Sequence, residues 1–371
     1  MLIGQMAAGP GENKGLHDLL EVGTNFLRCL ETLSHVEADD IQIATAPKHP
    51  VLQQDRMTLF RYDRADTGPA PIGPVLIVYG LIGRPWMIDL QEDRSLVRNL
   101  LADNVDLFVV DWGHPTRADQ YLTIDDYVDW YLDDCVDQIC QATGASAVTL
   151  LGICEGGVFS TLYAARHPQK VRNLILTVTP IDFHGDLKDA DPSHGFVNLW
   201  TRNLADEDIE GLIGTYGNLP GEIMAAVFLA MTPLKTLTKY NRDLLDLAAD
   251  EPRMLNFLRM EKWLADRPHH PGAAARQWLI DLYKENRLVR GTFEISGARI
   301  DLGSLTLPIL NIYAQHDHIV PPPCSTALAG LVGSTDYTEL ALPCGHIGVF
   351  VGEKSQSVVQ RGIVDWLRVR P

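Results

Sequence analysis

The chain has 371 residues, of which 46% are hydrophobic and 21% charged, and its 48 acidic against 31 basic residues give a formal net charge of -17. This length and apolar fraction fit one large α/β domain with an elaboration, or two ordinary domains, and exclude collagen-like, coiled-coil and disordered architectures. The excess of negative charge argues against nonspecific binding to nucleic acid or to an anionic membrane, since both need clustered cations.

The N-terminal sequence and the cysteines indicate a cytoplasmic protein. Residues 1–15 have neither a basic start nor a long apolar stretch, and no apolar run in the chain approaches the roughly 20 residues of a membrane helix. The six cysteines include no CxxC pair, which predicts reduced thiols rather than a disulfide framework or a zinc site. We therefore expect no membrane span and no bound metal.

Residues 1–45 are predicted to form a helical lead-in, because GLHDLLEVGTNFLRCLETL has apolar positions at helical spacing. Short and almost wholly apolar runs follow, separated by helical stretches such as 123–143 and 158–167. Runs that are apolar on both faces are typical of a parallel sheet covered by helices on both sides. The predicted strands are residues 75–79, 106–110, 147–151, 173–178, 309–314 and 337–341.

The strand pattern stops between residues 182 and 305, where helical patterns take over. About 120 residues without a convincing strand, between two sheet-like halves, indicate a helical insertion. The sequence therefore predicts an α/β fold whose core comprises residues 46–182 and 306–371, with a helical cap or lid at 183–305. Helices within the insertion are predicted at 220–232, 241–248 and 253–266.

The segment Ala147–Pro168 carries the strongest chemical signal. A predicted strand enters the sequence GICEG, residues 152–156, and an amphipathic helix follows directly, which is the G-x-nucleophile-x-G elbow with Cys154 in place of serine. The turn is so tight that the two glycines leave room for neighbouring backbone. It also places Cys154 at a helix N-terminus, where a thiolate is favoured, and makes the backbone N–H of Glu155 an oxyanion donor. On the motif alone, a buried structural thiol is an equal alternative.

Two further residues complete a predicted triad. Asp317 follows the strand 309–314, and His346 follows the strand 337–341. The order Cys154, Asp317, His346 is the nucleophile, acid and base order of the α/β-hydrolase fold. Each residue comes after its own strand, so all three are expected at the same edge of the sheet.

Other positions near these residues have more than one interpretation. The second oxyanion donor is predicted to be the backbone N–H of Leu81 in the loop 79–86, although an ordinary glycine-rich turn is equally compatible. His316 and His318 flank the acid, and His318 in particular is either a solvated loop histidine or a secondary donor to the triad. Asp182, after the preceding strand, is an alternative acid.

Metal and cofactor sites lack support in the sequence. There is no HExxH, no GxxxxGK[ST] and no strand-borne GxGxxG motif. His269 and His270 lie in a proline-rich loop without a third ligand nearby, and both are expected to be solvated. The prediction is an enzyme without a bound cofactor.

With these residues in place, the chain resembles the catalytic subunit of a polyhydroxyalkanoate synthase, of the short two-subunit kind called class III. The resemblance extends from about residue 50 to the end and includes the insertion. Residues 155 and 83 depart from the pattern, being glutamate and glycine where related chains often have glutamine and asparagine. The matching segments are LLGICEGG at 150–157, RPWMIDLQEDRSL at 84–96, VTPIDF at 178–183, FLRMEKW at 257–263, DHIVPP at 317–322 and GHIGVFV at 345–351.

The resemblance implies polymerisation of (R)-3-hydroxyacyl-CoA, commonly the 3-hydroxybutyryl thioester, into a polyester with release of CoA. It implies that Cys154 carries the acyl group and that His346 is the base that activates the Cys154 thiol. Asp317 then either orients His346 or activates the incoming 3-hydroxyl. It further implies a noncatalytic second subunit, a homodimer, and a cytoplasmic location at the surface of polyester granules. Two alternatives are a cysteine-dependent hydrolase of a small ester or lactone, and a noncatalytic scaffold that coats granules.

Overall fold

The structure is a computed structural model of the chain, and it describes residues 29–64, 71–187, 195–231 and 250–370 together with Thr24 and Leu27. The chain divides into two compact units, one comprising Met1–Gln42 with Phe228–Lys262 and the other Ile43–Val227 with Trp263–Pro371. The predicted helix at 241–248 and most of the predicted lead-in at 1–45 lie outside the described residues.

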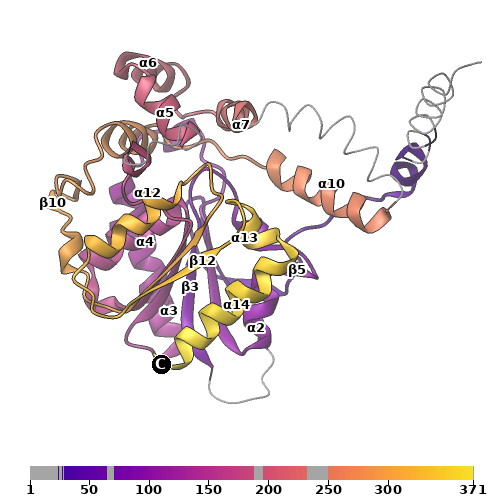
Figure 1. Cartoon of the computed structure of the whole chain (residues 1–371), viewed down its shortest axis with the longest axis horizontal. Coiled ribbons are helices and arrows are strands. Elements are labelled where there is room, and N and C mark those ends of the chain that lie inside the picture. Colours follow the sequence, from indigo (N-terminus) through magenta and orange to yellow (C-terminus); the bar gives the residue numbers. More distant parts are fainter. Residues whose placement is uncertain are drawn as a thin grey trace, which may run out of the picture. The chain divides into compact units, whose positions relative to one another are not determined.

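The second unit contains a central sheet, which has eight strands among the described residues (Figure 1). The strand order is β1-β2-β6-β3-β7-β8-β11-β12. β1, β2 and β6 pair antiparallel, and all pairs from β6 to β12 are parallel. The predicted α/β class with a mostly parallel sheet is confirmed. The strands are β1 (Lys48–Gln54), β2 (Met57–Tyr62), β3 (Ile72–Val78), β6 (Val105–Asp111), β7 (Val148–Ile153), β8 (Val171–Thr177), β11 (Ile309–Ala314) and β12 (Tyr337–Leu342).

All six predicted strands are present, with bounds shifted by at most a few residues, but the hairpin β1–β2 was not predicted. The reason lies in its position at the sheet edge. β1 contains no buried residue and includes Pro50, which an edge strand tolerates. β2 alternates buried and half-buried positions over most of its length. A search for runs that are apolar on both faces therefore passes over both strands.

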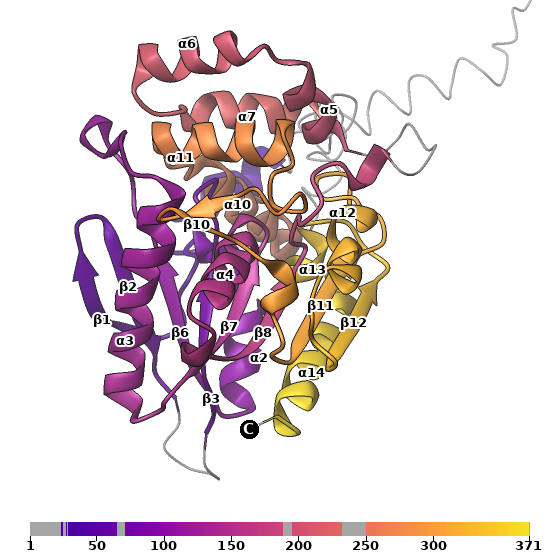
Figure 2. The ribbon, with the colours of Figure 1, turned by 90° about the vertical axis from the view of Figure 1, so that its left-hand side faces the viewer.

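Helices cover the two faces of the sheet. α2 (Leu96–Ala102) and α14 (Glu353–Arg368) pack together on one face, and α3 (Leu132–Thr143) and α4 (Glu155–Arg166) pack on the other (Figure 2). A π-helical turn, η3 (Asp126–Tyr131), leads directly into α3. The middle strands are consequently shielded on both sides, and Val75 to Val78 of β3 have no exposed surface. Shorter elements of this unit are β4 (Asp89–Gln91), β5 (Arg94–Ser95), α12 (Pro322–Thr326) and α13 (Gly348–Val351).

Part of the predicted insertion belongs to this same unit. The helices α5 (Phe196–Asn203), α6 (Asp206–Tyr216) and α11 (Gly272–Arg276) lie beyond the carboxyl ends of the strands (Figure 2). α11 continues into the π-helix η7 (Gln277–Lys284). The insertion also contains two short strands where none was predicted, β9 (Glu294–Ile295) and β10 (Ala298–Arg299), which form a hairpin because Ser296 and Gly297 both adopt positive φ.

The first unit contains much of α10 (Glu251–Ala265), close to the predicted helix at 253–266. Met254 packs with Cys29, and both side chains are buried. α7 (Gly221–Ala230) crosses the boundary between the two units. All six cysteines are free thiols. No helix in the described part of the chain is long and apolar enough to cross a membrane.

Candidate active site

Cys154 lies at the turn between β7 and α4. Its backbone has φ 52° and ψ -119°, a conformation that residues with a side chain rarely adopt and that is typical of a nucleophile elbow. A Cβ atom on Gly152 would collide with Gly157, and one on Gly156 would collide with the carbonyl oxygen of Val78. The glycines are therefore required for the close packing of strand and helix, as the sequence predicts. Cys154 itself is half-buried.

Asp317 lies in the loop after β11, with its side chain buried. Its Oδ2 accepts a hydrogen bond from Nδ1 of His346 at 2.7 Å. Its Oδ1 accepts from the backbone N–H groups of Ile319 and Val320, each at 2.9 Å. Donors therefore engage both oxygens, which stabilises an ionised carboxylate and fixes its orientation.

His346 lies between Asp317 and Cys154. Burial by itself would lower the pKa of His346, but the charges of Asp317 and Cys154 and the hydrogen bonds to both raise it well above 6.5. Because Nδ1 is hydrogen-bonded to Asp317, Nε2 is the ring nitrogen available for the hydrogen bond with Cys154. The structure thus brings the three residues of the predicted triad together, although they lie up to 192 positions apart in the sequence.

The side chain of Glu155 has a position that the sequence did not predict. Its carboxylate is buried, and Oε2 accepts the backbone N–H of Leu81 at 2.6 Å and that of Ile82 at 3.3 Å. The N–H of Leu81, predicted as the second oxyanion donor, is therefore engaged by Glu155 in this structure. A buried carboxylate needs donors, and these two backbone groups supply them.

His270 contradicts the prediction that it is solvated. Only 1% of its side chain is exposed, and its Nε2 lies 2.8 Å from Oε1 of Glu155. The adjacent His269 is 45% exposed and accepts the backbone N–H of Gly221. Because Glu155 and His270 are 115 positions apart, nothing in the local sequence distinguishes the buried histidine from its exposed neighbour.

Two tyrosines that were not predicted also belong to the site. Burial raises the pKa of Tyr79 above its ordinary value, and the negative charge of Cys154 adds to this effect. Burial also raises the pKa of Tyr283, again with a contribution from Cys154. Both hydroxyls are consequently neutral hydrogen-bond donors near the thiol. Tyr283 comes from η7, so the insertion contributes to the surroundings of Cys154.

The loop that follows β3 is fixed by contacts from two other segments, the end of β6 and Trp263. Nε1 of Trp112 donates to the carbonyl oxygen of Tyr79 at 2.7 Å. The guanidinium of Arg84 makes two bonds to Asp111, at 2.8 and 2.6 Å, and Nε1 of Trp263 donates to the carbonyl oxygen of Arg84 at 3.0 Å. This loop is therefore held rigidly beside the elbow.

The sequence also offered Asp182 as an alternative acid and His318 as a secondary donor. Oδ1 of Asp182 accepts from Nδ2 of Asn286 and from the backbone N–H of His184, so the carboxylate that contacts His346 is that of Asp317. His318 is half-buried beside Asp317, and its secondary role stays a prediction. In the described ranges, no three His, Cys, Asp or Glu side chains are grouped so that they could hold a metal ion.

Comparison with known proteins identifies the fold family of the chain. The family model of the alpha/beta hydrolase fold matches residues 73–353. The solved structure of a thermophilic esterase from Thermogutta terrifontis has a TM-score of 0.50 and 20% identity, covering 85% of this chain and 95% of its own. At that identity the likeness concerns the fold alone.

Curated relatives are much more similar in sequence. The poly(3-hydroxyalkanoate) polymerase subunit PhaC of Allochromatium vinosum is 43% identical over 359 residues, which cover 96% of this chain and 98% of that protein. The subunit of the same name from Synechocystis is 43% identical, covering 97% of this chain and 94% of that protein. The chain belongs to the α/β-hydrolase fold family and, within it, to the poly(3-hydroxyalkanoate) polymerase family.

Proposed function

We propose that the chain polymerises (R)-3-hydroxyacyl groups from CoA thioesters, with 3-hydroxybutyryl-CoA as the expected substrate, and that Cys154 carries the growing acyl chain as a thioester. The observation that carries this proposal is the Cys154, His346 and Asp317 constellation on a strained elbow, in a chain that is 43% identical to named polymerase subunits. No bound cofactor is needed, because CoA enters with the substrate and leaves as a product.

The acylation step follows from the geometry. Nε2 of His346 accepts the proton of the Cys154 thiol, and the charge of Asp317 stabilises the resulting imidazolium. The thiolate attacks the carbonyl carbon of the CoA thioester, and the backbone N–H of Glu155 stabilises the oxyanion. The C–S bond to CoA then breaks, and His346 returns its proton to the CoA sulfur. Leu81 can assist only if Glu155 releases its N–H.

The hydrogen bonds of Asp317 favour one of its two suggested roles. Oδ2 is engaged by His346, and Oδ1 by two backbone N–H groups. Three of the roughly four acceptor positions of the carboxylate are thus occupied by protein donors, one of them His346 itself. This supports Asp317 as the residue that orients His346, which would then also accept the proton of the incoming 3-hydroxyl.

We further propose that the described part of the insertion 183–305 that belongs to the second unit covers the site. His270 and Tyr283 come from this segment and lie near Cys154. A cover of this kind would exclude water, so that the acyl group on Cys154 survives until a hydroxyl attacks it. This favours a polymerase over the alternative of a hydrolase for small esters or lactones.

The proposal includes a noncatalytic second subunit, a homodimer and association with polyester granules. The relative from Allochromatium vinosum is named as a subunit, which supports a partner. A covered site must open for CoA and polymer, and a partner that binds the open form would shift that equilibrium by its difference in affinity. The isolated chain should therefore show a lag that a partner or a polymer primer shortens.

The test mixes purified chain with 3-hydroxybutyryl-CoA, with and without a second subunit, while free thiol and turbidity are followed together. Release of CoA with rising turbidity is the expected result. Release of CoA without polymer would replace this proposal by the hydrolase, and absence of both in the presence of the partner would favour the noncatalytic scaffold.

A further inference from the structure

Glu155 and His270 form a buried pair that the acylation step does not use. Each side chain is 1% exposed, and Nε2 of His270 lies 2.8 Å from Oε1 of Glu155. Glu155 is the residue directly after Cys154, so it brings a carboxylate to the place where a thiolate and an oxyanion must form. An uncompensated negative charge at this position would oppose both species.

The hydrogen bonds around the pair define where its protons lie. Oε2 of Glu155 accepts two backbone N–H groups, as an ionised carboxylate does. Nε2 of His270 faces the other oxygen of that carboxylate, and Nδ1 faces the carbonyl oxygen of Pro271 at 3.3 Å. Both of these oxygens can only accept, so the ring satisfies them when it carries two protons. The pair is then an imidazolium and a carboxylate, with no net charge.

We propose that His270 is a positioning residue that neutralises the Glu155 carboxylate and directs it away from Cys154. The insertion thereby sets the charge beside the nucleophile. This inference rests on the proposed role of Cys154 as the nucleophile and adds a residue that acts through Glu155 rather than on the substrate.

The surroundings of the pair support this assignment. The backbone of His270 makes two reciprocal hydrogen bonds with Leu219, both at 2.9 Å, so the insertion fixes the imidazole in place. The charge of Glu155 also influences Tyr127 and Tyr283, and burial raises the pKa of both hydroxyls. They cannot supply a positive charge. Within the described ranges, His270 is the basic side chain at ion-pair distance from Glu155.

Among the described residues, His346 and the Tyr79 and Tyr283 hydroxyls interact electrostatically with Cys154, and Arg267 interacts with Tyr79. The substitutions at His270, Glu155 and His269 used in the test leave all of these side chains in place. A change in the ionisation of Cys154 on substitution of His270 is thus attributable to the carboxylate of Glu155.

The test measures how fast iodoacetamide alkylates Cys154 at different pH values, with the Cys154 peptide quantified by mass spectrometry in the full chain. Replacing His270 by glutamine leaves the carboxylate unneutralised. We expect His270→Gln to slow alkylation at pH 7 about tenfold and to raise the midpoint of the pH profile by about one unit. The double variant Glu155→Gln with His270→Gln removes both charges and should return to within about threefold of the wild type. His269→Gln, at the exposed neighbour, is the matched control and should behave as wild type.

Several outcomes would overturn the inference. A wild-type alkylation profile in His270→Gln would do so, as would a loss of polymerisation in His270→Gln that the double variant does not recover. If His270→Gln does not fold, the double variant decides: a neutral pair predicts an unchanged midpoint on loss of both groups, whereas a fall of about one unit would show that the carboxylate is not neutralised. Polymerisation by Cys154→Ala would instead refute the proposed function, which separates the two failures.

Discussion

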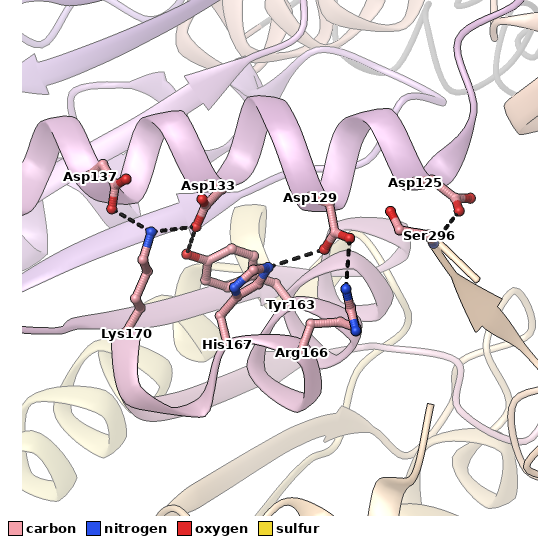
Figure 3. Close-up of polar contacts among 9 residues, drawn as sticks. All are labelled: Asp125, Asp129, Asp133, Asp137, Tyr163, Arg166, His167, Lys170 and Ser296. Atoms are coloured by element: carbon pink, nitrogen blue, oxygen red, sulfur yellow. Dashed lines mark hydrogen bonds and ion pairs between the residues drawn. The ribbon is translucent and has the colours of Figure 1, made fainter. Parts of the chain in front are cut away.

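Two regions of the molecule place carboxylates opposite basic side chains, and they differ in burial and in the donors that each carboxylate accepts. The first is a ladder along η3 and α3, in which Asp125, Asp129, Asp133 and Asp137 recur at every fourth residue (Figure 3). Asp129 pairs with Arg166 and His167, and both Asp133 and Asp137 pair with Lys170. The exposed fraction of the aspartate side chains in these pairs rises from 10% at Asp129 to 59% at Asp137.

The second region comprises the pairs Asp317 with His346 and Glu155 with His270. Here the carboxylate side chains are at most 1% exposed. Each carboxylate also accepts two backbone N–H groups. In the ladder, the aspartates are bound mainly by side chains that come from α4 and from the residues just after it. This segment lies against α3 (Figure 3).

This contrast separates structural from catalytic charge in this fold. Solvent screens the exposed end of the ladder, where the side chain of Asp137 is 59% exposed, so its pair with Lys170 contributes little to stability. The buried pairs keep their full electrostatic effect and are held by the backbone, which is what a catalytic site requires. Regular spacing of acidic residues in the sequence therefore marks the helix face that pairs with α4 and the turn after it, and the active carboxylates are those with no such pattern.

The largest expected effect is that of replacing the base. His346→Gln removes the proton acceptor of Cys154, and we expect acylation to slow by about 10² to 10⁴-fold. Single-turnover release of CoA, followed in a rapid-mixing experiment, measures this step. His316→Gln, at an exposed residue of the neighbouring loop, serves as the control and should remain within about twofold of the wild type. Acylation at the normal rate in His346→Gln would exclude it as the base.

A smaller effect is expected from the acid. Asp317→Asn removes a charge that raises the pKa of His346, so the inflection assigned to His346 in the pH dependence of kcat/KM should move to lower pH. An orienting role predicts equal losses, of about tenfold or more, in single-turnover acylation and in elongation. A loss confined to elongation would show instead that Asp317 acts on the 3-hydroxyl. Normal activity in Asp317→Asn, with loss in Asp182→Asn, would move the acid to Asp182.

The smallest effect is expected in the ladder. Lys170→Met should lower the free energy of unfolding by about 0.5 to 1 kcal/mol at pH 7, and 1 M salt should reduce this difference. Burial alone would raise the pKa of Asp133, but hydrogen bonds from Lys170 and Tyr163 lower it below 3.8. The stabilisation is therefore complete above that pH and is lost as the pH falls through the lowered value.

Urea unfolding at several pH values tests this comparison, with Arg172→Met at a nearby exposed position as the control. Polymerisation by Lys170→Met should match the wild type. A loss of activity without a loss of stability would mean that the ladder does more than support the fold.

The sequence predicted those parts of the fold that depend on local pattern. Five of the six predicted strands are mostly buried and largely apolar, and the elbow is a contiguous motif, so both could be predicted from local sequence. The sixth, β12, lies at the other edge of the sheet and has a single buried residue. Asp317 and His346 could be placed because each follows a strand, and parallel strands end at one edge of the sheet.

The remaining features depend on contacts between distant segments. The burial of His270 arises from its pairing with Glu155, and no property of the proline-rich loop distinguishes it from the exposed His269. The engagement of Leu81 by the Glu155 carboxylate also requires the three-dimensional arrangement of β3 and the elbow. The edge hairpin β1–β2 was missed because edge strands lack the two-sided apolar pattern of the interior.

The most direct test of the account is to trap the acyl group. The wild-type chain and Cys154→Ala are each mixed with a single equivalent of 3-hydroxybutyryl-CoA, quenched in acid, and digested for peptide mass spectrometry. We expect a 3-hydroxybutyryl thioester on the peptide containing Cys154, no label in the folded Cys154→Ala chain, and no label on the half-buried Cys140 or Cys344. An acyl group on any other residue, or on the Cys154→Ala protein, would contradict it.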